Sequence, residues 1–301
     1  MRVLILGATG MLGSALCFVL GRGGRFDVTG TARSDALTRL FPTSEHARVL
    51  SGVHPLQVGA LESLFAHTRP DVVINCVGVI KQVAGAQDEA LCMAVNARFP
   101  HTLSDHCAKA GARLIHFSTD CVFSGQKGQY VEADPADAID LYGRSKFLGE
   151  IDAPHAITLR TSIIGHELAG GSNGLIGWFL SQRGTVQGFG RAVFSGLPTT
   201  YLSEIIANHI LPNSALSGLY HVASEPISKL TLLQCVKQIY GLTTEIVPSD
   251  DVIIDRSLNG NRFLQATHCH IPAWPELIAH MQQTAHDWDP ALRHAHSQKV
   301  F

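Results

Sequence analysis

The sequence has no excess of charge of either sign. Its 301 residues include 23 Lys and Arg against 25 Asp and Glu, a formal net charge of -2 at pH 7, and charged residues make up only 16% of the chain. A surface that holds a nucleic-acid backbone needs clustered cations, so we expect no nucleic-acid partner. Hydrophobic residues make up 46%, which suffices for a sizeable core and argues against disorder.

Long apolar runs and paired cysteine motifs are missing as well. No window holds the roughly 18 apolar residues that a membrane helix needs, so we expect no membrane partner. The apolar run at residues 3–6 stops at Gly7, which indicates a strand entering a turn and not an export signal. We therefore expect a cytoplasmic protein. The seven cysteines are scattered without a C-x-x-C spacing, which predicts reduced, mostly buried thiols.

Short apolar runs alternate with helical patterns in the first half of the chain. The predicted strands cover residues 3–6, 28–32, 72–77, 114–117 and 157–159. The predicted helices cover residues 11–20, 61–67, 88–110 and 141–150. This alternation predicts an α/β fold in which helices cover both faces of a doubly wound parallel sheet. Ligands of such a sheet bind at the carboxyl ends of its strands.

The pattern changes after about residue 160. Glycine-rich turns become frequent, and one more strand and helix are predicted at residues 219–223 and 229–240. We predict a first domain of residues 1–160 and a smaller C-terminal lobe of residues 161–301. A segment near residues 200–225 is expected to return to the first domain.

A glycine-rich loop follows the first predicted strand and opens the first predicted helix. Its spacing is G-x-x-G-x-x-G, which suits the tight turn, the close approach of a pyrophosphate and the close helix packing of a Rossmann dinucleotide site. The helix N-terminus would face the phosphates with unpaired N–H groups. The predicted cofactor contacts in this loop are Gly7, Thr9, Gly10, Met11, Leu12 and Gly13.

The end of the second predicted strand bears on the choice of cofactor. An acidic residue there would bind the ribose 2′-hydroxyl of NAD, whereas an Arg suits the 2′-phosphate of NADP. No acid ends this strand, and Arg33 and Ser34 follow it. The sequence therefore favours NADP(H) over NAD(H).

Tyr142 and Lys146 lie four residues apart and would share one face of a helix. An ammonium beside a phenol would lower the pKa of the phenol and make it a usable proton donor or acceptor. Ser118 and Thr119 follow the predicted strand 114–117, at the sheet edge where chemistry is expected. A hydroxyl there can bind both a substrate oxygen and the phenol.

These segments carry a family resemblance. The glycine loop and residues 118–123 (STDCVF), 142–146 (YGRSK) and 160–162 (RTS) resemble the extended short-chain dehydrogenase/reductases, more narrowly their dTDP-4-dehydrorhamnose reductase branch. The resemblance implies that Tyr142 donates a proton, that Lys146 tunes it and holds the nicotinamide ribose, and that Thr119 orients a keto oxygen. These three residues are the expected catalytic set.

The resemblance also implies contacts with cofactor and substrate. Asn75 and Asn96 match positions near the cofactor, and Cys76 and Val77 join them in that predicted set. The predicted substrate contacts are Lys81, Ser118, Phe123, Arg160, Thr161, Ser162, Phe194 and Arg256. The chain departs from the branch at residues 76–81, at Ile163 and at residues 194–199, so the sugar and the nucleotide stay open.

The implied function is NADPH-dependent reduction of a 4-keto-6-deoxy nucleotide-sugar for cell-surface polysaccharide precursors, and a UDP-linked amino sugar is one alternative substrate. A nucleotide-sugar epimerase or dehydratase, or a non-catalytic NADP-binding regulatory subunit, are the other functions considered. His268, Cys269 and His270 invite a metal site, but no second ligand cluster is spaced to close it, so no metal is expected. A homodimer is left open.

Overall fold

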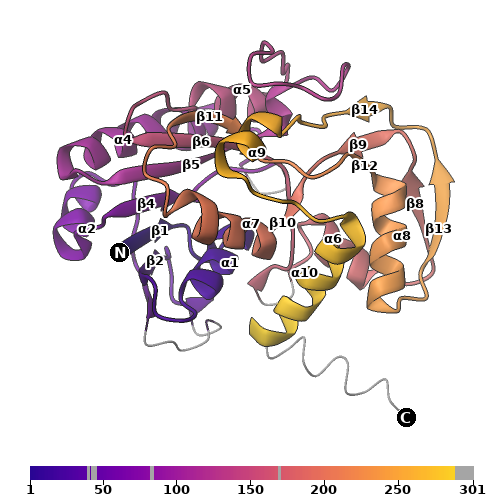
Figure 1. Ribbon diagram of the computed structural model, residues 1–301, viewed down its shortest axis with the longest axis horizontal. Coiled ribbons are helices and arrows are strands. Elements are labelled where there is room, and N and C mark those ends of the chain that lie inside the picture. Colours follow the sequence, from indigo (N-terminus) through magenta and orange to yellow (C-terminus); the bar gives the residue numbers. More distant parts are fainter. Residues whose placement is uncertain (39–40, 42–45, 82–84, 169–170, 289–301) are drawn as a thin grey trace.

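Seven parallel strands form the main sheet of the computed structural model, which describes residues 1–38, 41, 46–81, 85–168 and 171–288. The strand order is β11-β6-β5-β4-β1-β2-β3, and every neighbouring pair is parallel (Figure 1). The strands are β1 (Arg2–Leu6), β2 (Asp27–Thr31), β3 (Ala47–Leu50), β4 (Val72–Asn75), β5 (Arg113–Thr119), β6 (Ala156–Thr161) and β11 (Gly218–His221). The order reverses between β1 and β4, the place where doubly wound sheets bind ligands.

Helices cover both faces of this sheet, as the sequence predicted. Val3 and Ile5 of β1 pack in the core that also contains α1 (Met11–Leu20) and α7 (Thr199–Ile205). The alternate residues Leu4 and Leu6 pack in a second core with α2 (Ala60–Thr68) and α4 (Phe99–Ala110). Successive strand residues point to opposite faces, so hydrophobic residues throughout β1 require cover on both sides. The predicted Rossmann-type α/β fold is confirmed.

Residues 88–110 do not form the single regular helix that the sequence predicted. α3 (Glu89–Cys92) runs into a π-helical segment, η2 (Met93–Arg98), before α4 begins. Pro100, in the first turn of α4, has no N–H and cannot donate to the preceding turn, which accounts for the wider turn at this point. The wider turn contains Asn96, whose side chain bonds to the backbone of Val79 after β4.

The edge strand β3 was also missed, because its half-exposed residues lack a clear apolar alternation. α5 (Leu141–Leu148) ends two residues before the predicted limit of residue 150, and Gly149 is its C-cap. The predicted helices at residues 11–20 and 229–240 have the bounds of α1 and α8 (Lys229–Tyr240).

The second half of the chain forms small sheets and further helices, most of them beside the main sheet (Figure 1). The strands are β7 (Ile163–Ile164), β8 (Thr185–Phe189), β9 (Ala192–Phe194), β10 (Leu197–Pro198), β12 (Ile227–Ser228), β13 (Glu245–Ser249) and β14 (Ile254–Asp255). The remaining helices are η3 (Asp120–Val122), α6 (Leu175–Ser181), η5 (Ile206–Ile210), α9 (Asn261–Thr267) and α10 (Trp274–Trp288). β11 lies at one edge of the main sheet, beside β6. The division at residue 160 stays a prediction.

Within the part of the chain that the structure describes, no helix combines the length and the apolar character that crossing a bilayer requires.

Candidate active site

The glycine loop lies at the reversal point of the sheet, directly after β1. Gly7 has a φ of 81°, a conformation that side chains other than glycine rarely adopt. The Gly10 N–H donates to the Gly7 carbonyl at 3.1 Å, and the Ala8 N–H donates to the Thr31 carbonyl at 2.9 Å. The loop is therefore a tight turn anchored to the neighbouring strand β2.

Close packing of α1 on the sheet depends on two further glycines. A Cβ atom on Gly13 would overlap the Gly7 carbonyl oxygen, and one on Gly30 would lie 2.7 Å from the Ala8 Cβ atom. α1 begins after Gly10 without a side-chain cap. Its first N–H groups point out of the helix end and can bind an anion, as the sequence predicted for a pyrophosphate.

The other predicted cofactor residues around the loop differ in exposure. Leu12 is buried in the main core, so only its backbone is available to a ligand. Thr9 and Met11 are half-buried, and the Met11 methyl group packs against Gly174 at the start of α6. Arg33 and Ser34 follow β2 and are exposed.

The asparagine side chains brace the segment that follows β4. Buried Asn75 lies within 3.2 Å of His116 Nδ1 and accepts a hydrogen bond from the Val77 N–H at 3.1 Å. Buried Asn96 accepts from the Val79 N–H at 2.8 Å and donates to the Val79 carbonyl at 2.9 Å. These amides hold the edge of the predicted cofactor site, with Cys76 and Val77 half-buried between them. Direct contact with a cofactor stays a prediction.

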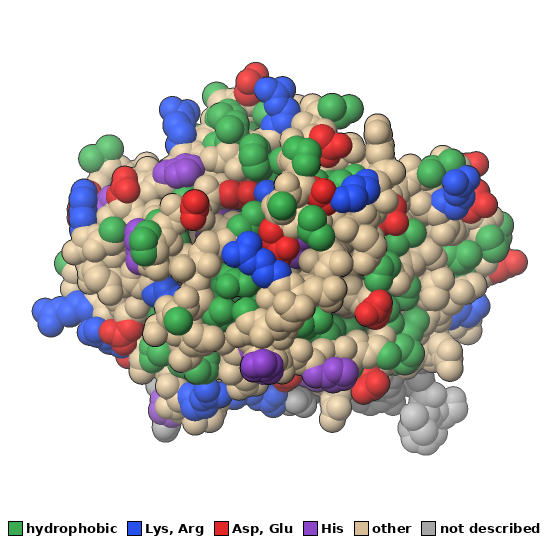
Figure 2. All heavy atoms as spheres, turned by 45° about the horizontal axis from the view of Figure 1, so that its top comes forward, with side chains coloured by type: hydrophobic (Ala, Val, Ile, Leu, Met, Phe, Trp, Pro, Cys, Tyr) green, Lys and Arg blue, Asp and Glu red, His purple; other side chains and the backbone are tan. Residues whose placement is uncertain are grey.

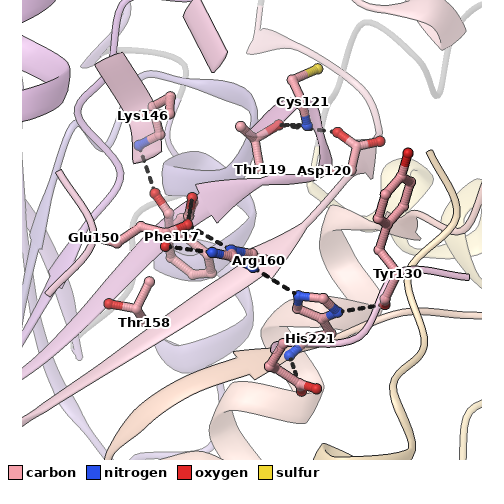
Figure 3. A network of polar contacts seen from close by, with 12 residues as sticks. Phe117, Thr119, Asp120, Cys121, Tyr130, Lys146, Glu150, Thr158, Arg160 and His221 are labelled. Carbon is pink, nitrogen blue, oxygen red and sulfur yellow. Dashed lines mark hydrogen bonds and ion pairs between the residues drawn. The ribbon is translucent and has the colours of Figure 1, made fainter. Parts of the chain in front are cut away.

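β5 ends at Thr119, whose hydroxyl organises the following turn. It donates to Asp120 Oδ1 at 3.1 Å and accepts from the Cys121 N–H at 3.1 Å (Figure 3). Burial raises the pKa of Asp120, while Lys229 and Arg256 act in the opposite direction. The Thr119 hydroxyl thus lies beside a carboxyl group whose pKa is raised.

Tyr142 lies in the first turn of α5, which Asp140 caps by accepting a hydrogen bond from the Gly143 N–H at 2.9 Å. Burial raises the pKa of the Tyr142 phenol, Cys121 adds to the rise and the Thr119 hydroxyl opposes it. Lys81 binds Asp140 at 2.9 Å, and its ammonium lies 5.6 Å from the centre of the Tyr142 ring.

Lys146 is buried one turn after Tyr142, and its ammonium donates to the Phe117 carbonyl at 2.6 Å. Burial lowers its pKa to about 8, and the nearby Glu150 carboxylate opposes that change. The sequence predicted that Lys146 would lower the pKa of Tyr142, and for this geometry that is wrong. The phenol pKa shifts upward because burial raises it, Cys121, Asp120 and Asp140 raise it further, and the Thr119 hydroxyl opposes them only in part.

Several predicted substrate contacts lie inside the protein. Phe123 is fully buried and stacks on Tyr130, with 4.1 Å between ring centres. Ser118 and Arg160 both bind Glu150, and the Thr161 hydroxyl donates to the Ser162 carbonyl at 3.2 Å. In the structure these side chains bind other protein groups next to the candidate site. Their contact with substrate stays a prediction.

Two cations from the second half of the chain approach the Thr119 turn. Arg256 donates from Nε to the Phe123 carbonyl at 2.9 Å, and its Nη1 lies 3.8 Å from Cys121 Sγ. The Lys229 ammonium lies 3.6 Å from the ring centre of the buried Phe194. Sequence reasoning missed Lys229, because only the packing of α8 against the site places it near Asp120. Its position as the first residue of a predicted helix was the one available signal.

On the face shown in Figure 2, basic and acidic side chains are interspersed, and neither sign forms a continuous patch. Among the described residues, no group of three or more His, Cys, Asp or Glu side chains is arranged to hold a metal ion.

Comparisons with known proteins give relatives in sequence and in fold. A dTDP-4-dehydrorhamnose reductase of Mycobacterium tuberculosis is 34% identical over 170 residues, 54% of this chain and 49% of that protein. The chain thus matches about half the length of that relative. The spore coat polysaccharide biosynthesis protein SpsK of Bacillus subtilis is 30% identical over 256 residues, 82% of each protein.

Among solved structures, the dTDP-4-dehydrorhamnose reductase of Bacillus anthracis in complex with NADP has a TM-score of 0.77 at 19% identity, and the match covers 94% of this chain and 99% of that one. That likeness concerns the fold. The family model described as RmlD substrate binding domain matches residues 1–248 of the 301, so the chain belongs to the RmlD substrate binding domain family.

Proposed function

We propose that the protein is an NADPH-dependent reductase of the keto group of a 4-keto-6-deoxy nucleotide-sugar, and that its product is a precursor of cell-surface polysaccharide. The observation that carries the proposal is the meeting of Thr119, Tyr142 and Lys146 at the carboxyl edge of the sheet that also holds the glycine loop. The M. tuberculosis relative, a dTDP-4-dehydrorhamnose reductase, supports the reaction class.

The cofactor belongs to the same proposal. The glycine turn and the open start of α1 suit a dinucleotide pyrophosphate, and the related B. anthracis structure holds NADP. Exposed Arg33 and Ser34 after β2 favour the 2′-phosphate of NADP over NAD. When bound, the reduced nicotinamide supplies the hydride. Residues 1–160 would hold the cofactor, and residues 161–301 would hold most of the substrate.

The proposal gives a separate role to each of these three residues, and the described geometry supports it. Because the pKa of Tyr142 is raised, the phenol holds its proton at neutral pH and gives it up only to a strongly basic oxygen, such as the one that forms as the carbonyl is reduced. Thr119 would orient that oxygen with its hydroxyl. The Lys146 ammonium, charged below its pKa of about 8, would favour the developing negative charge.

The first experiment measures NADPH oxidation by the purified protein with dTDP-4-dehydrorhamnose and with UDP-linked 4-keto-6-deoxy sugars. We expect stoichiometric consumption of NADPH, faster than that of NADH, and a fall in kcat of about 10²–10⁴-fold in Tyr142→Phe. Product formation without net NADPH consumption would favour an epimerase or dehydratase. Unchanged turnover in Tyr142→Phe would refute the assigned proton donor, and NADPH binding without any turnover would favour a regulatory subunit.

A further inference from the structure

α5 and the residues after it are fastened to the end of β5 at two consecutive positions. The Lys146 ammonium donates to the Phe117 carbonyl at 2.6 Å. The next residue of the strand, Ser118, donates from its hydroxyl to Glu150 Oε1 at 2.6 Å. Lys146 and Glu150 are four residues apart, so the ammonium and the carboxylate reach the strand side by side.

A buried arginine from the neighbouring strand holds the carboxylate. Arg160 of β6 donates from Nε to Glu150 Oε1 at 2.7 Å and from Nη2 to Glu150 Oε2 at 2.8 Å. Only 3% of the Arg160 side chain is exposed, whereas 12% of the Glu150 side chain is. A guanidinium so deeply buried needs a paired charge, so the bidentate contact keeps a negative charge at this place.

The contacts continue from Arg160 toward the loop before α5. Arg160 Nη1 lies 3.4 Å from His221 Nε2, and His221 Nδ1 lies 3.0 Å from the Tyr130 carbonyl (Figure 3). The guanidinium also lies 5.1 Å from the centre of the Phe123 ring. The residues between Thr119 and Tyr142 are therefore tied to the same arginine that orients Glu150.

We propose that Glu150 is a positioning residue of the active site, which keeps the buried Lys146 ammonium protonated and aligned on β5 while Arg160 holds the carboxylate in place. This inference rests on the proposed function in one respect, because it takes Lys146 to be a catalytic residue. It assigns Ser118 and Arg160 to the support of Lys146, in place of the substrate contact that the sequence predicted.

Among the charged and titratable groups that face Lys146, Glu150 does most to favour its charged form. Burial alone would favour the neutral amine, and of the groups around it Glu150 opposes burial most, with Cys76 after β4 second. His116 of β5 is held neutral because burial and Lys146 itself keep its pKa well below the usual value. Tyr142 keeps its proton, as argued above, and the Arg160 charge is matched by its two bonds to Glu150.

The test follows the proton of Lys146 directly. The full-length protein is labelled with ¹³C at the lysine ε-carbons and titrated by NMR, and Lys146→Met identifies the signal. In Glu150→Gln we expect the titration midpoint of Lys146 to fall by roughly one to three pH units, the usual effect of losing an adjacent opposite charge. The basic limb of the kcat profile should move down by the same interval, so that activity recovers at lower pH.

Ser118→Ala is the matched control, because it removes a hydrogen bond to the same carboxylate but leaves the charge. Its midpoint should match that of the wild type. If Glu150→Gln does not fold, because Arg160 is left unpaired, the double variant Glu150→Gln with Arg160→Met removes both charges and should show a smaller fall.

A midpoint that stays at the wild-type value in the folded variants would overturn the inference. A wild-type protein that oxidises no NADPH would instead count against the proposed function, and the NMR titration would still decide the role of Glu150.

Discussion

At the residue scale, burial sets the protonation states around Thr119 more strongly than any single charge does. Burial raises the pKa of Tyr142 and of Asp120 and lowers that of Lys146 to about 8. Each change favours the neutral form of the group. The Tyr142 phenol is thereby kept protonated, while the Lys146 ammonium, charged below its pKa of about 8, can stabilise a negative charge that develops beside it.

Lys229 is the residue for which this view makes a separate prediction. Its ammonium lies over the Phe194 ring and makes no hydrogen bond or ion pair with any residue in the described ranges. Burial lowers the pKa of Lys229, and the Asp120 charge opposes this change. We expect Lys229 to donate a charged hydrogen bond to the keto sugar nucleotide, so Lys229→Met should raise the KM for this substrate by about tenfold and change kcat little. Steady-state kinetics would show this. Lys237→Met on the same helix is the control, and equal KM values in the two variants would contradict the prediction.

At the element scale, α1 packs closely against the turn after β1. Gly13 allows this contact, because a Cβ atom there would overlap the Gly7 carbonyl oxygen. At Gly10 a Cβ atom would lie 3.5 Å from the same oxygen, an ordinary distance. The two glycines of this loop thus have different roles. Gly13 allows α1 to pack against the turn, and Gly10 leaves room for a ligand to approach the backbone.

Replacement of these glycines should separate stability from cofactor binding. We expect Gly13→Ala to lower the free energy of unfolding by about 1–3 kcal/mol, because α1 must move away from the sheet, and also to weaken NADPH binding. Gly10→Ala should keep wild-type stability and lose affinity for NADPH. Urea unfolding and fluorescence titration with NADPH measure the two effects. Wild-type stability in Gly13→Ala would show that the loop is looser than described.

At the scale of the whole molecule, buried polar groups link the main sheet to the segments that close over its edge. His221 at the end of β11 is fully buried, its backbone N–H donates to the Glu132 carboxylate at 2.8 Å, and its ring lies between Arg160 and Tyr130. Burial and the Arg160 charge lower the pKa of His221 to about 4. The folded protein therefore holds a buried, neutral imidazole at the end of β11.

This imidazole predicts acid sensitivity. The unfolded chain binds a proton at His221 below its ordinary pKa of 6.5, whereas the folded protein binds it only near pH 4, so stability falls as the pH drops through that interval. The two values correspond to about 3 kcal/mol. We expect a flatter pH dependence of urea unfolding between pH 6.5 and 4 in His221→Gln. His54 is exposed, so His54→Gln is the control and should keep the wild-type pH dependence. A wild-type pH dependence in His221→Gln would contradict the prediction.

Local patterns predicted much of the fold and singled out the residues that are expected to be catalytic. The bounds of α1 and α8, the glycine turn and the Tyr142 to Lys146 spacing all depend on residues within a few positions of one another. Helix periodicity and turn formation act over the same short range, so the sequence carries this information directly. The family model matches residues 1–248, the part of the chain that contains these motifs.

The sequence by itself therefore determined the sheet with its covering helices, the dinucleotide-type loop and the expected catalytic set. Only the tertiary structure decided that Ser118, Arg160 and Glu150 join in one buried group behind Lys146, and that Lys229 approaches from the other half of the chain. The physical reason is that the sequence pattern around a charged residue on a strand is the same whether its side chain faces a ligand or a buried partner. Which one it meets depends on β5, β6 and α5 packing together, and that packing also sets the burial that shifts each pKa.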